Sequence, residues 1–165
     1  NVLEFNEEFV DPEILEDLLN SIYDIPIIIT TENAVSLCLA SNFLDIQKLF
    51  GSCEQVLCHN VCLENVVDFY VLSCDYELEN LKQSCLQCFS YENYFVFRDP
   101  KLLSLTFDKI NEILKVMKFG NEYDRFLEEK IFQFMVAWVE NDIPYRENYL
   151  SKLLQFVSFE EFYEP

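Results

Sequence analysis

The sequence predicts a mostly α-helical fold built from antiparallel helical pairs. Apolar residues recur at helical spacing over most of the 165 residues, and only a few residues separate one periodic segment from the next. The chain contains 2 Gly and 5 Pro, too few for the dense turns of a β-sandwich or barrel. A hydrophobic content of 51% is enough to form a core, which excludes intrinsic disorder.

The first 60 residues predict three helices and one short strand. Asp11-Pro12-Glu13 supplies an N-cap, a proline at the first helical position and a first-turn acid, so a helix begins there and ends before Pro26. Residues 27–29 then predict a short buried strand, and helical spacing follows over residues 35–43 and 46–57. The first helix has one broad apolar face, formed by Ile14, Leu15, Leu18, Leu19 and Ile22.

Residues 61–165 predict a helical array. Helical spacing runs over residues 63–74 and 78–89, lapses in an aromatic stretch near 91–97, and resumes at 107–114 before Gly120. Asp99-Pro100 repeats the cap pattern of Asp11-Pro12 and predicts another helix start. The strongest apolar stripe runs from Leu127 to Trp138, and a last helix is predicted over residues 149–157.

The charge balance excludes several classes of partner. The 30 acidic and 11 basic residues give a net charge of −19, which repels the phosphates of nucleic acid and anionic lipid headgroups. No apolar run approaches the roughly 18 residues of a membrane-spanning helix, and the start lacks the pattern of a signal peptide. We therefore expect a soluble protein of the cytoplasm or nucleus that binds neither nucleic acid nor membrane.

The cysteines predict reduced thiols and no bound metal. There are 7 Cys, an odd number, and most stand at apolar helical positions. Cys53, Cys58, His59 and Cys62 form the best zinc-like set, but no repeated short C-x-x-C pair flanks them. Cys85 and Cys88 fit one helix face better than a redox motif at a helix N-terminus. A metal or redox protein is kept as an alternative, and no cofactor is expected.

The sequence also lacks the motifs of common enzymes. His59 is the only histidine, and no Gly-rich phosphate loop, G-x-S-x-G elbow or H-E-x-x-H helix occurs. Acidic pairs such as Glu128-Glu129 are abundant, but paired catalytic carboxylates need unlike environments, and these pairs fit a solvated surface. We therefore expect an interaction module and not an enzyme.

The order of these segments resembles the Kelch-like type of BTB–BACK protein, with the second half of a BTB domain over residues 1–60 and a BACK domain over residues 61–165. The BTB-like part rests on segments that include Val10-Asp11-Pro12, Leu18 to Tyr23, Ile28-Ile29-Thr30, Glu32 to Val35, Ala40 to Leu44 and Cys53 to Leu57. The BACK-like part rests on Asn65 to Tyr76, which resembles the 3-box, and on Glu129, Ile131-Phe132, Ala137-Trp138-Val139, Arg146, Leu150, Leu153-Leu154, Val157 and Pro165.

The resemblance implies a substrate-recruiting adaptor of a cullin-3 RING ubiquitin ligase. The family's first BTB half, which carries most of its dimer interface and a hydrophobic-x-Glu motif, has no counterpart here, so a homodimer and cullin binding are inherited expectations. Residues 118–129 depart from the family pattern. By resemblance, the cullin-binding residues are Asn42, Phe43, Leu44, Asp45, Gln47, Asn60, Leu63, Val66, Val67 and Tyr70.

Two alternatives stay open for this resemblance. A scaffold or transcription-related interaction protein of the same fold could have lost cullin binding and could join other proteins directly. Phe43 and Phe50 could also simply belong to the core, because apolar residues at helical spacing usually pack inward. The substrate is not readable from the sequence.

Overall fold

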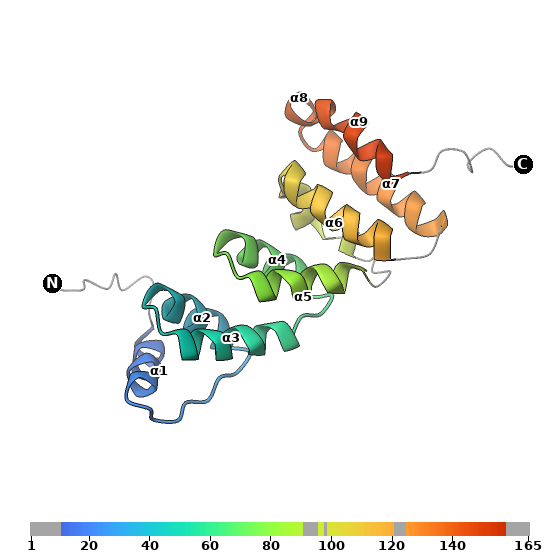
Figure 1. The fold of residues 1–165 in the computed structure, drawn as a ribbon. Helices are drawn as coiled ribbons and strands as arrows, with labels where there is room; N and C mark the ends of the chain where they lie inside the picture. The colour runs from blue at the N-terminus through green and yellow to red at the C-terminus, as the bar shows by residue number, and fades with distance from the viewer. Residues whose placement is uncertain (1–10, 91–95, 98, 121–124, 158–165) are drawn as a thin grey trace, which may run out of the picture. The chain divides into compact units, whose positions relative to one another are not determined.

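The fold is mostly α-helical, as the sequence predicts (Figure 1). The computed structural model describes residues 11–90, 96–97, 99–120 and 125–157, without the side chains of 118–120 and 125–127. Every regular element in those ranges is helical. In chain order they are α1 (Pro12–Ile22), α2 (Ala34–Phe43), α3 (Gln47–His59), α4 (Val66–Asp75), α5 (Glu79–Ser90), the 3₁₀ helix η2 (Pro100–Ser104), α6 (Phe107–Gly120), α7 (Arg125–Glu140), α8 (Ile143–Arg146), η3 (Glu147–Tyr149), α9 (Leu150–Leu153) and η4 (Leu154–Phe156).

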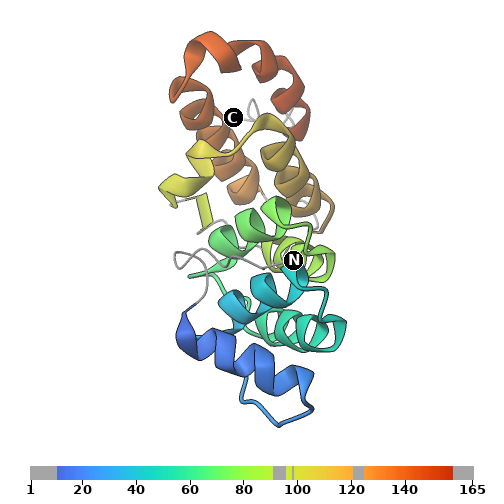
Figure 2. The same cartoon turned by 90° about the vertical axis from the view of Figure 1, so that its left-hand side faces the viewer.

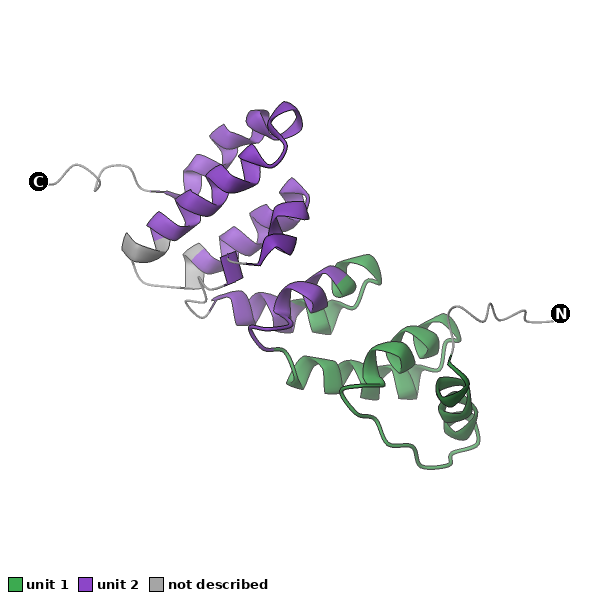
Figure 3. Cartoon of the chain, turned by 180° about the vertical axis from the view of Figure 1, so that it is seen from behind, with its two compact units in different colours: residues 1–61, 72–82 green, residues 62–71, 83–165 purple. Residues whose placement is uncertain are grey.

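The chain divides into two compact units, shown in green and purple in Figure 3. Unit 1 comprises residues 1–61 and 72–82, and unit 2 comprises residues 62–71 and 83–165. Helices α4 and α5 each contribute one part to each unit. The boundary expected between residues 60 and 61 stays a prediction.

In unit 1, helix α1 begins where the sequence predicts but buries only two of the five residues of its apolar face. The Asp11 side chain accepts a hydrogen bond from the Glu13 amide at 3.1 Å, and Pro12 occupies the first turn. Ile14 and Leu18 are buried, where α1 packs against α2 (Figure 2). The other members of the predicted face, Leu15, Leu19 and Ile22, are exposed. The contact with α2 covers only one side of so broad a stripe.

The strand expected over residues 27–29 is wrong for this structure. Residues 25–30 form an irregular connection between α1 and α2, and the Ile28 side chain is 80% exposed. A strand requires hydrogen bonds to a neighbouring strand, and no segment among the described residues supplies one. The β-branched composition alone therefore did not produce a strand.

Three helices end in the same way, with an acidic residue in the left-handed backbone region. Asp24, Asp45 and Glu77 have φ of 56°, 57° and 57°. The residue after each one donates its amide hydrogen to a carbonyl in the last helical turn, as Ile46 does to Ser41 at 2.8 Å. This is the Schellman arrangement, in which glycine is the usual left-handed residue. Because the chain contains only 2 Gly, an acidic residue takes this position after these three helices.

Glu54 of α3 holds the start of α5 in unit 1. Its side chain is buried, with 4% of the residue exposed, and its carboxylate accepts three hydrogen bonds. The donors are the Asn80 amide at 3.1 Å, the Asn80 side chain at 2.7 Å and the Leu81 amide at 3.3 Å. Because these amides lie in the first turn of α5, the carboxylate both caps that helix and interacts favourably with the positive end of its dipole.

The core of unit 2 is fixed by two buried aromatic residues with polar ends. Trp138 of α7 is 1% exposed and donates from Nε1 to the Leu105 carbonyl at 2.9 Å. Arg146 lies 4.3 Å over the Trp138 ring and donates to the Leu103 and Trp138 carbonyls at 2.7 and 2.8 Å. Tyr70 of α4 is 0% exposed. Its hydroxyl donates to the Glu112 carboxylate at 2.6 Å, so the polar groups of both aromatic side chains have an acceptor.

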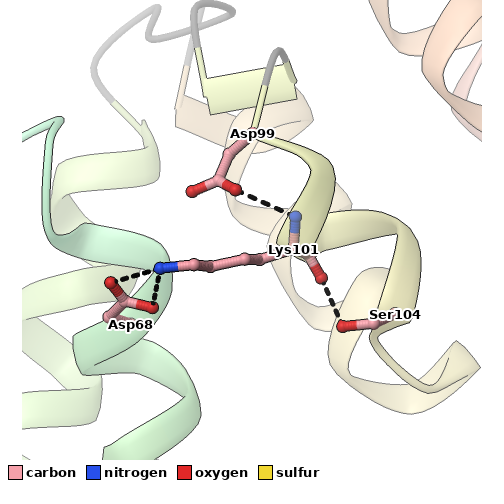
Figure 4. A network of polar contacts seen from close by, with 4 residues as sticks. All are labelled: Asp68, Asp99, Lys101 and Ser104. Atoms are coloured by element: carbon pink, nitrogen blue, oxygen red, sulfur yellow. Dashed lines mark hydrogen bonds and ion pairs between the residues drawn. The ribbon is translucent and has the colours of Figure 1, made fainter.

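An ion pair joins α4 to η2 within unit 2 (Figure 4). Lys101 Nζ lies 2.6 and 2.7 Å from the two Asp68 carboxylate oxygens, and this hydrogen bonding raises the pKa of Lys101. The Asp99 carboxylate accepts from the Lys101 amide at 2.9 Å, which confirms the cap predicted from Asp99-Pro100. The helix that it begins is only a short 3₁₀ segment, because the chain turns at Leu105 into extended backbone.

The last predicted helix, over residues 149–157, is also broken into short segments, α9 and η4, after α8 and η3. Among the described helices, none combines the length and the apolar character needed to cross a membrane. Four sequence features fall largely or wholly outside the described residues: the start of the chain, the aromatic stretch at 91–95, the divergent segment near 121–124 and the end from 158.

Candidate interaction surface

The turn between α2 and α3 presents an exposed phenylalanine on a well-defined backbone. Phe43, the last residue of α2, is 77% exposed. The backbone after it is set by the left-handed Asp45 and by the hydrogen bonds from the Asp45 and Ile46 amides to Asn42 and Ser41. The Gln47 side chain donates to the Asp45 carboxylate across the turn. An aromatic side chain on such a turn can act as an anchor for a partner protein.

The structure brings the first group of predicted binding residues together in this turn. Asn42, Phe43, Asp45 and Gln47 are exposed, and Leu44 is partly buried. Because so much of the Phe43 side chain is exposed, the alternative that it belongs to the core of this unit is wrong for the described structure. Phe50, one helical turn into α3, is partly buried.

The second group of predicted binding residues is divided between surface and core. Asn60 is exposed and caps α3 by donating from its side chain to the Val56 carbonyl at 2.7 Å. Leu63 is 40% exposed, whereas Val66, Val67 and Tyr70 are at most 2% exposed. These last three side chains belong to the core of unit 2, so a partner cannot reach them. Helical spacing in the sequence identifies the apolar side of α4. That this side packs inward and does not face a partner is decided by the helices around it, which the sequence does not show.

Sequence reasoning missed a second exposed turn beside the first. The turn after α1 carries Tyr23, which is 75% exposed, and the left-handed Asp24. Lys48, in the first turn of α3, lies 3.1 Å from the Asp24 carboxylate, which places this turn next to the start of α3. A signal existed in the sequence, because Tyr23-Asp24-Ile25 repeats the apolar-acid-apolar pattern of Leu44-Asp45-Ile46.

The cysteines do not assemble a metal-like set in the described structure. Cys53 is buried, Cys58 is partly buried, and His59 and Cys62 are exposed. No group of three or more His, Cys, Asp or Glu among the described residues is placed to hold a metal ion. Burial raises the pKa of both Cys38 and Cys53 from 9.0 to about 12, so these two thiols stay protonated and are poor ligands and nucleophiles at neutral pH.

Comparison with known families identifies the two parts of the chain. Residues 1–61 match the BTB/POZ domain, and residues 66–162 match the BACK domain, described as BTB And C-terminal Kelch. The helical fold and these matches place the chain in the BTB–BACK family of protein-interaction modules, to which it belongs.

Individual relatives are Kelch-type proteins of viruses and vertebrates. The chain is 25% identical over 121 residues to Kelch repeat and BTB domain-containing protein 1 of vaccinia virus, covering 68% of this chain and 22% of the relative. It is 27% identical over 159 residues to Kelch-like protein 25 of Xenopus tropicalis, covering 95% and 26%. The identity to Kelch-like protein 40 of Xenopus laevis is 23% over 156 residues, covering 94% and 25%. The chain thus spans about a quarter of the length of these relatives.

Proposed function

We propose that this chain is the connecting part of an adaptor that recruits substrates to a cullin-3 RING ubiquitin ligase, with Phe43 as an anchor for the N-terminal region of cullin-3. The observation that carries the proposal is the 77% exposure of Phe43 on a turn whose backbone is fixed. Membership of the BTB–BACK family supports the choice of partner class.

The proposed contact surface is smaller than the set that the sequence predicted. It consists of the α2–α3 turn of unit 1, and the three buried residues of α4 are left out. Asn60, at the other end of α3, and Leu63 stay separate predictions. Tyr23 is added because its turn lies beside the start of α3. The adaptor would act by bringing two bound proteins close together and would carry out no reaction itself. Reduced cysteines are consistent with a cytoplasmic or nuclear location, and a homodimer is part of the same proposal.

Binding of the purified chain to the N-terminal domain of cullin-3 tests this function. We expect Phe43→Ala to weaken binding by a factor of about 30 or more, because truncating an anchor residue typically costs about 2 kcal/mol or more. Tyr145→Ala is a matched control, since Tyr145 is also an aromatic residue with 77% exposure but belongs to unit 2. Unchanged thermal unfolding of both variants would show that the fold is intact.

Two outcomes would overturn the proposal. If the unmodified chain shows no cullin-3 binding at high concentration, the ligase function fails and a scaffold of the same family remains. If binding occurs but Phe43→Ala weakens it no more than Tyr145→Ala does, the proposed anchor is wrong.

A further inference from the structure

The part of the chain that carries the exposed Tyr23 and Phe43 turns has an extreme charge balance. Residues 1–61 contain 11 Asp and Glu but a single Lys or Arg, which is Lys48. Residues 62–165 contain 19 Asp and Glu and 10 Lys and Arg. The negative charge is therefore least compensated in the segment that forms the candidate interaction surface.

Lys48 forms an ion pair with the nearby Asp24. Its Nζ lies 3.1 Å from the Asp24 carboxylate, and both side chains are more than 80% exposed. An ion pair so exposed contributes little stability. The Asp24 carboxylate nevertheless neutralises the positive charge of Lys48 beside the turn. The Asp45 carboxylate accepts a hydrogen bond from the Gln47 side chain, which is neutral and does not cancel its negative charge.

Helix ends add to this negative field. Both α1 and α2 present their C-termini at these turns, and neither has a basic residue in its last turn. A helix C-terminus carries about half a negative charge. The N-terminus of α3 lies at the α2–α3 turn and carries the opposite partial charge, whereas no helix starts at the turn after α1.

Apolar anchors project from the same two turns. Ile22, Tyr23 and Ile25 are 56%, 75% and 50% exposed at the first turn, and Phe43 is 77% exposed at the second. Large exposed apolar side chains next to each other are typical of protein interaction sites. Here they stand in an acidic surrounding, which restricts the partners that can approach.

From this combination we infer that the surface formed by residues 22–25 and 42–48 fits a partner face with an apolar pocket rimmed by lysine and arginine, and that Lys48 determines how strongly such a partner is attracted. The inference rests on the proposed function only for the identity of the partner. Opposite charges around the contact speed the encounter and disfavour acidic competitors. The apolar side chains then supply the contact that slows dissociation.

The field can be measured without any partner. Paramagnetic broadening of backbone amide signals by a cationic and by an anionic nitroxide reports the local potential. We expect the cationic probe to broaden the amides of residues 22–25 and 42–48 more than the anionic probe does, and more strongly than at residues 143–146 of unit 2. Equal broadening by the two probes at residues 22–25 and 42–48 would overturn the inference, whether or not cullin-3 binds.

Association kinetics then test the role of Lys48. With the N-terminal domain of cullin-3, we expect Lys48→Glu to raise the association rate constant about twofold to fivefold at low salt, and raised ionic strength to remove the gain. Lys115→Glu makes the same change in net charge on an exposed position of α6 and should have a smaller effect. If cullin-3 binds but Lys48→Glu is no faster than Lys115→Glu, the inference fails while the proposed function stands.

Discussion

Replacing the buried Glu54 is expected to destabilise unit 1 more than its position on a surface helix suggests. Glu54→Ala removes the acceptor of three hydrogen bonds, two of them from amides in the first turn of α5. A hydrogen bond to a charged group contributes roughly 1.5–3 kcal/mol net. Water can replace the acceptor at the exposed Asn80 but not at the Leu81 amide, whose residue is 0% exposed. We therefore expect a loss of about 2–4 kcal/mol in the free energy of unfolding.

Urea denaturation measures this loss. With a slope of about 2 kcal/mol per molar urea, a loss of 3 kcal/mol lowers the midpoint by about 1.5 M. Glu54→Gln keeps the shape and one oxygen acceptor but not the charge, so its effect should be intermediate. Hydrogen exchange at the Leu81 and Lys82 amides should speed up in both variants, because the start of α5 loses its cap.

The neighbouring Gln55 supplies the control, because it lies on the same helix with an exposed side chain. Gln55→Ala should change the free energy of unfolding by less than about 0.5 kcal/mol. If Glu54→Ala falls within the same range, the carboxylate does not hold α5 in place and the reasoning is wrong.

Two further substitutions and one pH dependence test other features. Glu77→Gly should stabilise the chain by about 0.5–1 kcal/mol in urea denaturation, because the left-handed backbone is costly for any residue with a Cβ. Burial raises the pKa of Cys38 and Cys53 from 9.0 to about 12, so the unfolded state loses these protons first and the free energy of unfolding should fall as pH rises above 9. Lys101→Ala should change the midpoint of urea denaturation only slightly, since its ion pair with Asp68 is more than half exposed.

Each of these has its own control. Gln87→Gly, on the exposed side of α5, should destabilise by about 1 kcal/mol, and stabilisation there too would show that the gain at residue 77 is not due to its backbone. The alkaline loss should be smaller in the double variant Cys38→Val, Cys53→Val, and an unchanged pH profile would contradict the role of the thiols. A large loss in Lys101→Ala that salt does not reduce would show that Lys101 acts through packing and not through charge.

The sequence alone determined the fold class, the starts of α1 and η2 and the family. These depend on local rules: a side chain that accepts from the next helical amide, a proline in the first turn, and apolar spacing near 3.6 residues. The Asp11 and Asp99 caps are such cases, and the structure confirms both. Both partners of such an interaction lie within a few residues of each other, so a short stretch of sequence is enough to predict it.

Only the tertiary structure decided which apolar residues are core and which form a surface. Val66 and Phe43 occupy equally apolar helical positions, yet the first is 0% and the second 77% exposed. The role of Glu54, 26 residues before its partner Asn80, and the pairing of Lys48 with Asp24 were likewise not readable. Burial and pairing depend on neighbours distant in sequence, and helical periodicity gives the direction of a face without saying what packs against it.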